Sequence, residues 1–317
     1  MKTRIVYVVV FDDSNYYFEQ AMVSACSVRM HNPDAEIVVV TDRASEALIT
    51  GWRRDIGKYV NTIVGVDVPS ELNKMQRSRW IKTNLRNLID GDFLFLDTDT
   101  VICRSLESID NATGDICAVV DWNSTFAQAR TNGYTLDKFR QAGWTIEADT
   151  DYFNSGVLFV RDNEKTRAFF TEWHNNWLST SSKGVYIDQV SLYHTNRHFG
   201  YVIQNLNGEW NCQTEGKFIN YLSNAYVLHY FAFANDWDGC MFYFKSRKVF
   251  EEIREQRCLP PTVIKKLSDP YRAFLPNYEV VSGAALQVYR ACDPIMKLYG
   301  SPRRFRVLKW VAKLLSR

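Results

Sequence analysis

Short, continuous apolar runs that alternate with helical segments are the feature that most constrains the fold of this 317-residue chain. A run of consecutive β-branched and aromatic residues predicts a strand that is buried on both faces. The expected strands are Ile5–Phe11, Glu36–Thr41, Thr62–Val66, Phe93–Leu96, Ile116–Val120, Gly156–Val160 and Ala225–Phe231. The segments with helical spacing or composition are Tyr17–His31, Ser45–Arg54, Asn73–Leu88 and Thr166–Leu178.

This alternation predicts the α/β class, with a mostly parallel, Rossmann-like sheet flanked by helices. Hydrophobic residues make up 46% of the chain and charged residues 23%, so a substantial core can be buried. The segment Leu259-Pro260-Pro261 is the best boundary signal. We therefore predict a main domain over residues 1–258 and a helical C-terminal region over residues 259–317.

Acidic residues follow most of the predicted strands. Ligands of open α/β sheets bind outside the carboxyl ends of the strands, so these positions are candidates for a binding site. Aspartate is also a common turn residue, which is the simpler explanation for any one of them. The segments are Asp12-Asp13, Thr41-Asp42, Asp97-Thr98-Asp99, Asp121-Trp122 and Arg161-Asp162.

The segment FLFLDTDT, residues 93–100, carries the strongest chemical signal. Side chains at positions i and i+2 of an extended segment point the same way, so Asp97 and Asp99 can face one point. Two ionised carboxylates at such a short distance repel each other unless a cation lies between them. Carboxylate oxygens are hard ligands, which suit Mg²⁺ or Mn²⁺. Such a metal could bind a diphosphate and stabilise its charge as a leaving group. The alternative is a solvated turn after a strand.

Together with four further stretches, this pair resembles the family 8 glycosyltransferases, which include glycogenin and bacterial lipopolysaccharide galactosyl- and glucosyltransferases. The resemblance covers residues 4–240 and implies the GT-A fold with a D-x-D metal site. The four stretches are VVVFDDSNY at residues 8–16, DYFNSGV at 151–157, IDQ at 187–189 and VLHY at 227–230. Basic residues on the helix before the D-x-D strand also match the family's pattern.

Carried over residue by residue, the resemblance implies four groups of site residues. The implied metal ligands are Asp97, Asp99 and His229, with Mn²⁺ or Mg²⁺ as the cofactor. The implied nucleotide-binding residues are Val10, Asp12, Asn15, Arg79, Lys82 and Thr98. The implied sugar-binding residues are Asp121, Asp151, Asn154, Ser155 and Gly156, and the implied catalytic residues are Gln189 and Asp188.

Each of these residues also has an alternative, purely structural explanation. Asn154 and Gly156 could shape a turn before a strand. Asp188 could cap a helix that begins at the next residue, which is a frequent role of aspartate. His229 could be a hydrogen-bonded core residue. The basic pair could lie on the solvated face of a helix.

The chain departs from the family late in the predicted domain, where family members carry the pattern H-x-x-G-x-x-K-P-W. The same register here gives His229, Ala232, Asn235, Asp236 and Trp237, so the Gly, Lys and Pro are absent. The family uses that lysine on the donor phosphate, and an acidic residue nearby disfavours an anion. The candidates to replace it are Lys245, Arg247 and Lys248.

The resemblance implies a retaining, metal-dependent transfer of a hexose from a UDP-sugar to a glycan or lipid-linked glycan acceptor, in lipopolysaccharide or capsule synthesis. One alternative is a catalytically degenerate, membrane-associated scaffold that binds sugar nucleotides. The other is a sugar-1-phosphate nucleotidyltransferase, which would normally carry a Gly-rich loop after its first strand, whereas residues 11–16 contain no glycine. Neither a P-loop nor a dinucleotide-binding G-x-G-x-x-G motif occurs.

The tail, residues 301–317, carries six Lys/Arg and no Asp/Glu, which leaves 32 basic against 36 acidic residues in the rest of the chain. A mildly acidic body does not suggest a nucleic-acid binder. Within the tail, apolar residues at helical spacing form one face and basic residues another, which is typical of a helix on an anionic membrane surface. A terminal helix docked on the domain is the alternative.

Cysteine usage and the N-terminus indicate where the protein works. The seven cysteines include no C-x-x-C pair, which fits a reducing compartment. The first apolar run is too short for a signal peptide, and no run approaches the length of a membrane span. We therefore expect a cytoplasmic protein that is peripherally associated with the inner face of the cell membrane.

Overall fold

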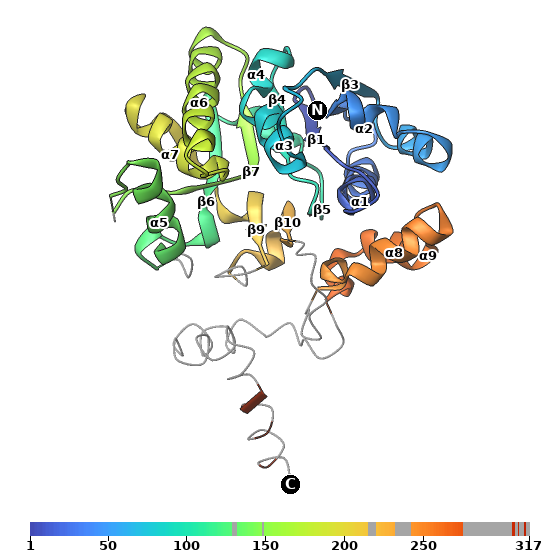
Figure 1. The fold of residues 1–317 in the computed structure, drawn as a ribbon. Helices are drawn as coiled ribbons and strands as arrows, with labels where there is room; N and C mark the ends of the chain where they lie inside the picture. Colours follow the sequence, from blue (N-terminus) through green and yellow to red (C-terminus); the bar gives the residue numbers. More distant parts are fainter. Residues whose placement is uncertain are drawn as a thin grey trace.

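The chain folds around a central sheet with helices on both faces (Figure 1). This computed structural model describes residues 1–128, 132–147, 149–214, 220–231 and 242–274, together with Arg306, Val307, Trp310 and Leu314. Within these residues, no helix is long and apolar enough to cross a membrane. The rest of the predicted tail and residues 232–241, including Ala232, Asn235, Asp236 and Trp237, lie outside the described residues.

The central sheet has seven strands in the order β3-β2-β1-β4-β7-β6-β8. In that order they span Thr62–Val66, Ile37–Asp42, Arg4–Val8, Phe93–Leu96, Phe153–Val160, Ile116–Val120 and Ile203–Asn205. Strands β3, β2, β1 and β4 are mutually parallel, β7 runs antiparallel to both of its neighbours, and β8 is parallel to β6. The predicted α/β class with a mostly parallel sheet is therefore confirmed.

A second sheet of three short strands continues from the carboxyl end of β4. It has the order β5-β10-β9, with bounds Thr100–Ile102, Val227–His229 and Cys212–Gln213. Strand β10 runs antiparallel to β5, in a register that places His229 opposite Thr100. This pairing brings a residue from late in the chain next to the acidic segment that follows β4.

The helices cover the sheet and one end of the molecule (Figure 1). The α-helices α1 to α9 span Tyr17–His31, Arg43–Ala47, Lys74–Thr83, Leu85–Leu88, Asn132–Ala142, Glu164–Ser182, Asp188–His198, Arg247–Gln256 and Pro261–Leu267. Short 3₁₀-helices η1 to η5 span Gly51–Lys58, Glu107–Asn111, Asp121–Asn123, Phe126–Gln128 and Gly208–Asn211. The remaining ones, η7 to η9, span Leu222–Asn224, Tyr243–Lys245 and Pro270–Ala273.

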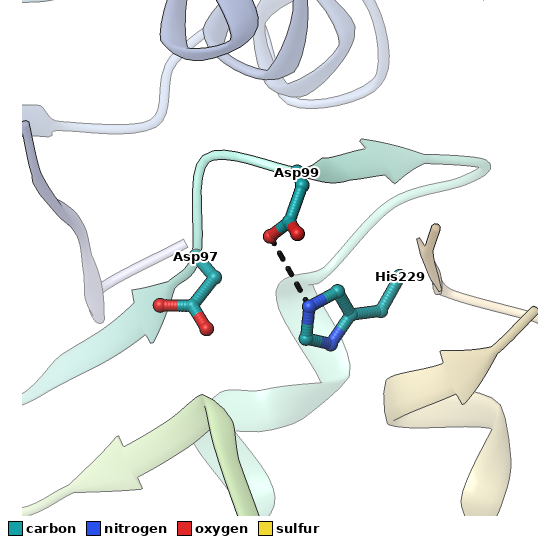
Figure 2. Close-up of side chains that lie close together, drawn as sticks. All are labelled: Asp97, Asp99 and His229. Carbon is teal, nitrogen blue, oxygen red and sulfur yellow. Dashed lines mark hydrogen bonds and ion pairs between the residues drawn. The ribbon is translucent and has the colours of Figure 1, made fainter. Parts of the chain in front are cut away.

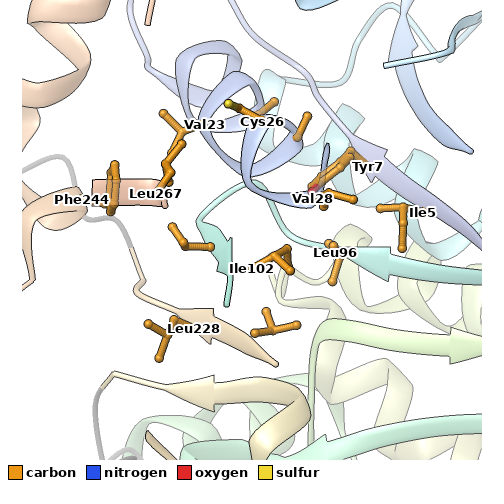
Figure 3. Packing of buried hydrophobic residues seen from close by; sticks show 14 of the residues in the cluster. Ile5, Tyr7, Val23, Cys26, Val28, Leu96, Ile102, Leu228, Phe244 and Leu267 are labelled. Carbon is orange, nitrogen blue, oxygen red and sulfur yellow. The ribbon is translucent and has the colours of Figure 1, made fainter. Parts of the chain in front are cut away.

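Alternate residues of each central strand enter two different cores, which explains why these strands are continuous apolar runs. On β1, Ile5 and Tyr7 pack in the cluster that contains α1 (Figure 3). Val6 and Val8 pack in the cluster on the opposite face, with residues of α3, α4 and α6. Strands buried on both faces are held rigidly, so the side chains at their carboxyl ends have fixed positions.

Helix α1 is buried on most of its surface because it lies between the sheet and the C-terminal helices. Every residue from Phe18 to Val28 is buried. Val23 of α1 and Leu267 of α9 belong to the same apolar cluster as β1, and both appear in Figure 3. Helix α9 lies in the region beyond residue 259, most of which is outside the described residues, so the predicted helical C-terminal region stays a prediction. The predicted boundary between residues 258 and 259 stays a prediction.

Two predicted helices are each divided in the structure. The segment Ser45–Arg54 becomes α2 and η1, separated near Gly51, which has a positive φ of 54°. The segment Asn73–Leu88 becomes α3 and α4, and Asn84, between them, leaves helical geometry at φ −104° and ψ 4°. Glycine adopts a positive φ at no steric cost, which explains the first break.

The predicted strands are confirmed with shifts at their ends. The strands at Thr62–Val66, Phe93–Leu96 and Ile116–Val120 have the predicted bounds. The strand expected over Ile5–Phe11 ends at Val8, and the backbone N–H of Phe11 donates to Ser45 Oγ instead of to a neighbouring strand. The run Ala225–Phe231 contributes only the three residues of β10.

The interface between α3 and α6 contains a histidine whose burial affects stability. The ring of His174 packs edge-on against Trp80, with centroids 5.1 Å apart, and its Nδ1 lies 2.8 Å from Thr83 Oγ1. Burial lowers the pKa of His174 from 6.5 to about 4. Between these pH values the unfolded chain binds a proton that the folded chain does not.

We predict that His174→Phe removes part of the acid sensitivity of folding. In the wild-type chain, the lowered pKa of this histidine gives a contribution to the free energy of unfolding that is complete above pH 6.5. That contribution is lost as the pH falls through about 4. In urea unfolding, the free energy of unfolding should fall between pH 7 and pH 4 in both proteins. The fall should be about 2 kcal/mol smaller in the variant than in the wild type. The control is His198→Phe, because the side chain of His198 is 69% exposed. Equal losses in the wild type and the His174 variant would contradict the prediction.

Candidate functional site

Two aspartates and a histidine converge where the two sheets meet (Figure 2). Asp97 and Asp99 flank the turn between β4 and β5, and His229 ends β10. One ligand atom from each lies within 4.8 Å of the others. Backbone hydrogen bonds between the strands hold them there. The Tyr230 N–H donates to the Asp99 carbonyl oxygen at 3.0 Å, and the Asp97 N–H donates to the Gly156 carbonyl oxygen at 2.7 Å.

The hydrogen bonds around His229 determine which ring nitrogen faces the aspartates. Asn154 is fixed at both ends, since its Nδ2 donates to an Asp121 carboxylate oxygen and its Oδ1 accepts from the Gly156 N–H. Asn211 Nδ2 donates to the same Asn154 Oδ1 at 2.9 Å, so Asn211 Oδ1 faces His229 Nδ1 at 3.1 Å. Nδ1 therefore carries a proton and donates it.

Nε2 of His229 then presents its lone pair to Asp99 Oδ1, 3.2 Å away. A lone pair and a carboxylate oxygen at this distance require a proton or a metal ion between them. A histidine whose other nitrogen donates to a fixed acceptor is the usual arrangement of a metal ligand. Two carboxylates with one imidazole are donors that fit Mn²⁺, and to a lesser extent Mg²⁺.

Gly156 on β7 leaves the room that the three residues need. A Cβ atom at this position would lie 2.4 Å from His229 Cε1 and 2.7 Å from Asp97 Oδ2. Real Cβ contacts do not occur at these distances. The glycine is therefore required for His229 and Asp97 to approach each other, which is more specific than the expected turn or sugar contact.

A buried lysine connects the acidic pair to a third carboxylate. Lys82 Nζ lies 3.1 Å from Asp97 Oδ1 and 3.2 Å from Asp188 Oδ2, and the lysine is only 1% exposed. Arg79 Nε pairs with the other oxygen of Asp188 at 3.0 Å. Burial raises the pKa of Asp188, but Lys82 and Arg79 outweigh it and hold that pKa well below its usual range. The carboxylate is thus charged, and the two basic residues are not a solvated helix face.

Asp188 is the first residue of α7, and the N-cap position is taken by Ile187. It accepts instead from Ser155 Oγ at 2.6 Å. The neighbouring Gln189 donates through Nε2 to the carbonyl oxygen of Phe153 at 3.1 Å. The helix thus begins one residue earlier than the capping alternative assumed, and both side chains face β7 at its amino-terminal end.

Asp121 is a second buried carboxylate in this region, at the end of β6. Burial raises its pKa, and hydrogen bonds from Asn154 and Gln189 oppose the increase. The next two residues, Trp122 and Asn123, have positive φ angles of 58° and 49°. The Trp122 N–H donates to Gln213 Oε1 at 2.6 Å, so β9 supports this strained turn.

Four of the six predicted nucleotide-binding residues follow the carboxyl ends of the neighbouring strands β1 and β4, and the other two, Arg79 and Lys82, lie on α3. Asp12 accepts from Lys74 Nζ at 2.7 Å and from the Ser14 N–H at 2.8 Å, and these groups lower its pKa to about 2. Asn15 Oδ1 accepts from the Tyr17 N–H at the start of α1, 3.3 Å away. Two further members, Val10 and Thr98, are buried nearby along the same edge.

The structure brings together most of the predicted site residues but not all of them. Asp151 is exposed before β7, and in the described part of the chain it makes no hydrogen bond or ion pair. Asn211 and Gln213 were not predicted although both are fully buried at the site. No spacing signals Asn211, which is 57 positions from the asparagine that it binds.

Of the proposed substitutes for the missing lysine, Arg247 pairs with Glu251 at 2.8 Å and with the hydroxyl of Tyr16 at 3.2 Å. These contacts place it beside the turn after β1. The register positions that lack the lysine lie outside the described residues, so the replacement stays a prediction.

Comparison with known proteins gives one family. The model of glycosyl transferase family 8 matches residues 8–239. Among solved structures, the chain is similar to the galactosyltransferase LgtC in complex with donor and acceptor sugar analogs, at 19% identity and a TM-score of 0.52, over 83% of this chain and 100% of that one. An active-site mutant of LgtC matches over the same shares, at 20% identity and a TM-score of 0.53.

Mouse xyloside xylosyltransferase 1, in its apo form, is also similar, at 11% identity and a TM-score of 0.50 over 73% of this chain and 98% of that one. None of the curated proteins matches the chain. At these identities the likeness to solved structures shows the fold.

We predict that Gly156→Ala separates His229 from Asp97 and destabilises the protein. The added methyl group must displace a buried ring or a carboxylate, which costs about 1–3 kcal/mol. Thermal unfolding of the variant should show the loss. Gly57→Ala is the matched control, because a Cβ there meets nothing within 4 Å. Wild-type stability in the Gly156 variant would show that the close approach is absent.

Proposed function

The chain belongs to glycosyl transferase family 8, and from that membership we propose that it is a metal-dependent, retaining hexosyltransferase that uses a UDP-sugar donor. The observation that carries the proposal is the convergence of Asp97, Asp99 and His229 within 4.8 Å at the carboxyl-terminal edge of the sheet. In open α/β folds this edge is where ligands bind. The hydrogen-bonded state of the histidine supports metal binding at the same point.

Asp97, Asp99 and His229 would hold Mn²⁺ or Mg²⁺ together with both phosphates of the donor. When bound, the ion would act as a Lewis acid that stabilises the negative charge of the UDP leaving group. Lys82 holds one carboxyl oxygen of Asp97 at 3.1 Å, which keeps that ligand in place. Together with Arg79, it also supplies positive charge near the departing phosphate.

The donor sugar would lie between the carboxyl ends of β4 and β6, next to the start of α7. As its bond to UDP breaks, positive charge develops at the anomeric carbon. The carbonyl oxygen of Phe153 can only accept a hydrogen bond, so Gln189 directs its Nε2 toward that oxygen. The Oε1 atom of Gln189 is then the one that would stabilise the positive charge. Asp121, Asp151, Asn154, Ser155, Gly156 and Asp188 are the proposed partners of the sugar.

The nucleoside would bind at the turn after β1. Asp12 and Asn15 would contact the base and ribose, with Val10 and Thr98 lining the same edge of the sheet. The Asp12 carboxylate is charged at neutral pH and can accept hydrogen bonds from the nucleoside.

We predict that Asp97→Asn lowers metal-dependent UDP release at least about 100-fold, because one charged metal ligand is lost. UDP release should be measured with Mn²⁺ and, in turn, UDP-glucose, UDP-galactose and their N-acetyl forms. Asp90→Asn is the control, since the side chain of Asp90 is 89% exposed and remote from this edge of the sheet. Full activity of Asp97→Asn, or a UDP affinity that Mn²⁺ and Mg²⁺ leave unchanged, would refute the metal site. Metal-dependent binding of a UDP-sugar without turnover would instead favour the scaffold.

The acceptor is proposed to be a glycan or a lipid-linked glycan at an anionic membrane surface, as in lipopolysaccharide or capsule synthesis. The support comes from the tail, whose basic and apolar residues alternate at helical spacing. Three apolar residues of the tail are exposed to solvent: Val307 at 59%, Trp310 at 64% and Leu314 at 51%. An anionic membrane would cover them and attract the neighbouring cations.

We predict that removal of residues 301–317 abolishes binding to anionic vesicles. Each Lys or Arg near such a surface contributes about 1 kcal/mol, so the six of the tail should dominate the attraction. Sedimentation with phosphatidylglycerol vesicles should carry down the full chain but not the truncated one. Phosphatidylcholine vesicles are the control. If both proteins sediment equally, the tail is not the membrane anchor.

A further inference from the structure

Arg254, on α8, lies outside the matched family range of residues 8–239, yet it contacts the turn after β1. Its Nη1 donates to the Asp13 carbonyl oxygen at 2.9 Å, and its Nη2 donates to that of Asn15 at 2.5 Å. These residues belong to the segment 12–16, which we call the nucleoside turn. One guanidinium therefore holds the main chain of the turn at two points.

The position of Arg254 is itself fixed by a buried partner. Glu19 on α1 is 0% exposed, and its two carboxyl oxygens accept from Arg254 Nε at 2.8 Å and Nη2 at 3.0 Å. Val249, Phe250 and Ile253 anchor α8 in the same apolar core as α1. The planar fork of an arginine can serve a carboxylate and two carbonyl oxygens at once, which an ammonium group cannot do in the same geometry.

The side chain of Asp12 holds the first half of the nucleoside turn, since it accepts from the Ser14 N–H at 2.8 Å and the Ser14 hydroxyl at 2.7 Å, but the main chain of the turn is less firmly held. Its internal backbone hydrogen bond, from the Asn15 N–H to the Asp12 carbonyl oxygen, is long at 3.4 Å. Tyr16, the residue that precedes α1, makes no side-chain cap for that helix. Its ring is covered instead by α8, with the Arg254 guanidinium 4.4 Å from the ring centroid and the ring of Phe250 stacked at 6.3 Å.

We propose that Arg254 is a positioning residue that holds the nucleoside turn in the geometry that binds the uridine part of the donor. The inference rests on the proposed function, because it takes the turn as the nucleoside site. Without Arg254 the turn keeps its sequence and its contacts to Lys74 but loses both main-chain anchors from α8. The nucleoside turn would then have to become ordered when the nucleotide binds, and the entropic cost of that ordering would weaken binding.

The test compares two full-length variants with the wild type. Arg254→Lys keeps the charge beside Glu19 but cannot make all four hydrogen bonds. The double variant Glu19→Gln/Arg254→Met removes both charges, so no buried carboxylate is left unpaired. UDP affinity with Mn²⁺ is measured by calorimetry, Mn²⁺ affinity without nucleotide by electron paramagnetic resonance, and KM and kcat by UDP release from the donor found to be active.

The loss of two hydrogen bonds should weaken UDP binding and raise KM roughly tenfold, while kcat at saturation and Mn²⁺ affinity stay within about twofold. Arg29→Lys is the matched control. Arg29 makes main-chain bonds of the same kind at the other end of α1, for example to the Tyr59 carbonyl oxygen at 2.9 Å and the Ala35 carbonyl oxygen at 3.0 Å. It should lower thermal stability and leave UDP affinity unchanged.

Three results would overturn the inference. One is wild-type UDP affinity in both Arg254 variants, which would contradict the positioning role while leaving the proposed function intact. Another is an equal loss of UDP affinity in Arg29→Lys, which would assign the effect to general destabilisation. The third is a wild-type chain that binds no UDP, which would refute the proposed function and this inference together.

Discussion

Carboxylates crowd together at the carboxyl-terminal edge of the sheet, and their mutual repulsion is the constraint on which the rest of the site depends. Lys82, buried to 1% exposure, lies between Asp97 and Asp188 and offsets part of it. Between Asp99 and the lone pair of His229, a metal ion or a proton meets the same requirement. Lys82 thus connects Asp97, a ligand of the proposed metal site, to Asp188, which also pairs with Arg79.

Rigid neighbours are what allow these groups to stay so close. Gly156 supplies the space. The amides of Asn154 and Asn211, hydrogen-bonded in series from the Asp121 carboxylate, orient the ring of His229. At the start of α1, Arg254 of α8 donates to the main chain of the nucleoside turn at two points. Both ends of the proposed donor site are therefore held by residues that touch its lining rather than by the lining alone.

Elements with one strong local signal were predicted well. Helix α1 and strands β3, β4 and β6 have the expected bounds, because apolar periodicity or a continuous apolar run defines each of them. Helix α7 was expected only as the alternative explanation for Asp188, because its sequence, DQVSLYHTNRH, is largely polar while seven of its residues are buried by tertiary contacts. The three-residue strands β5 and β8 were missed for a related reason, since a run so short carries no periodicity.

Apolar runs in the sequence predict the α/β class and the acidic pair after β4, while the residues proposed for the metal and the sugar follow from the family resemblance and stay predictions. What those residues touch depends on tertiary packing. The pairing of β10 with β5 brings His229 to Asp99 across 130 positions, and Arg254 reaches the turn after β1 across more than 230. Local sequence encodes torsion preferences and burial patterns over a few turns of chain, whereas contacts at these separations depend on how the whole sheet and its helices pack.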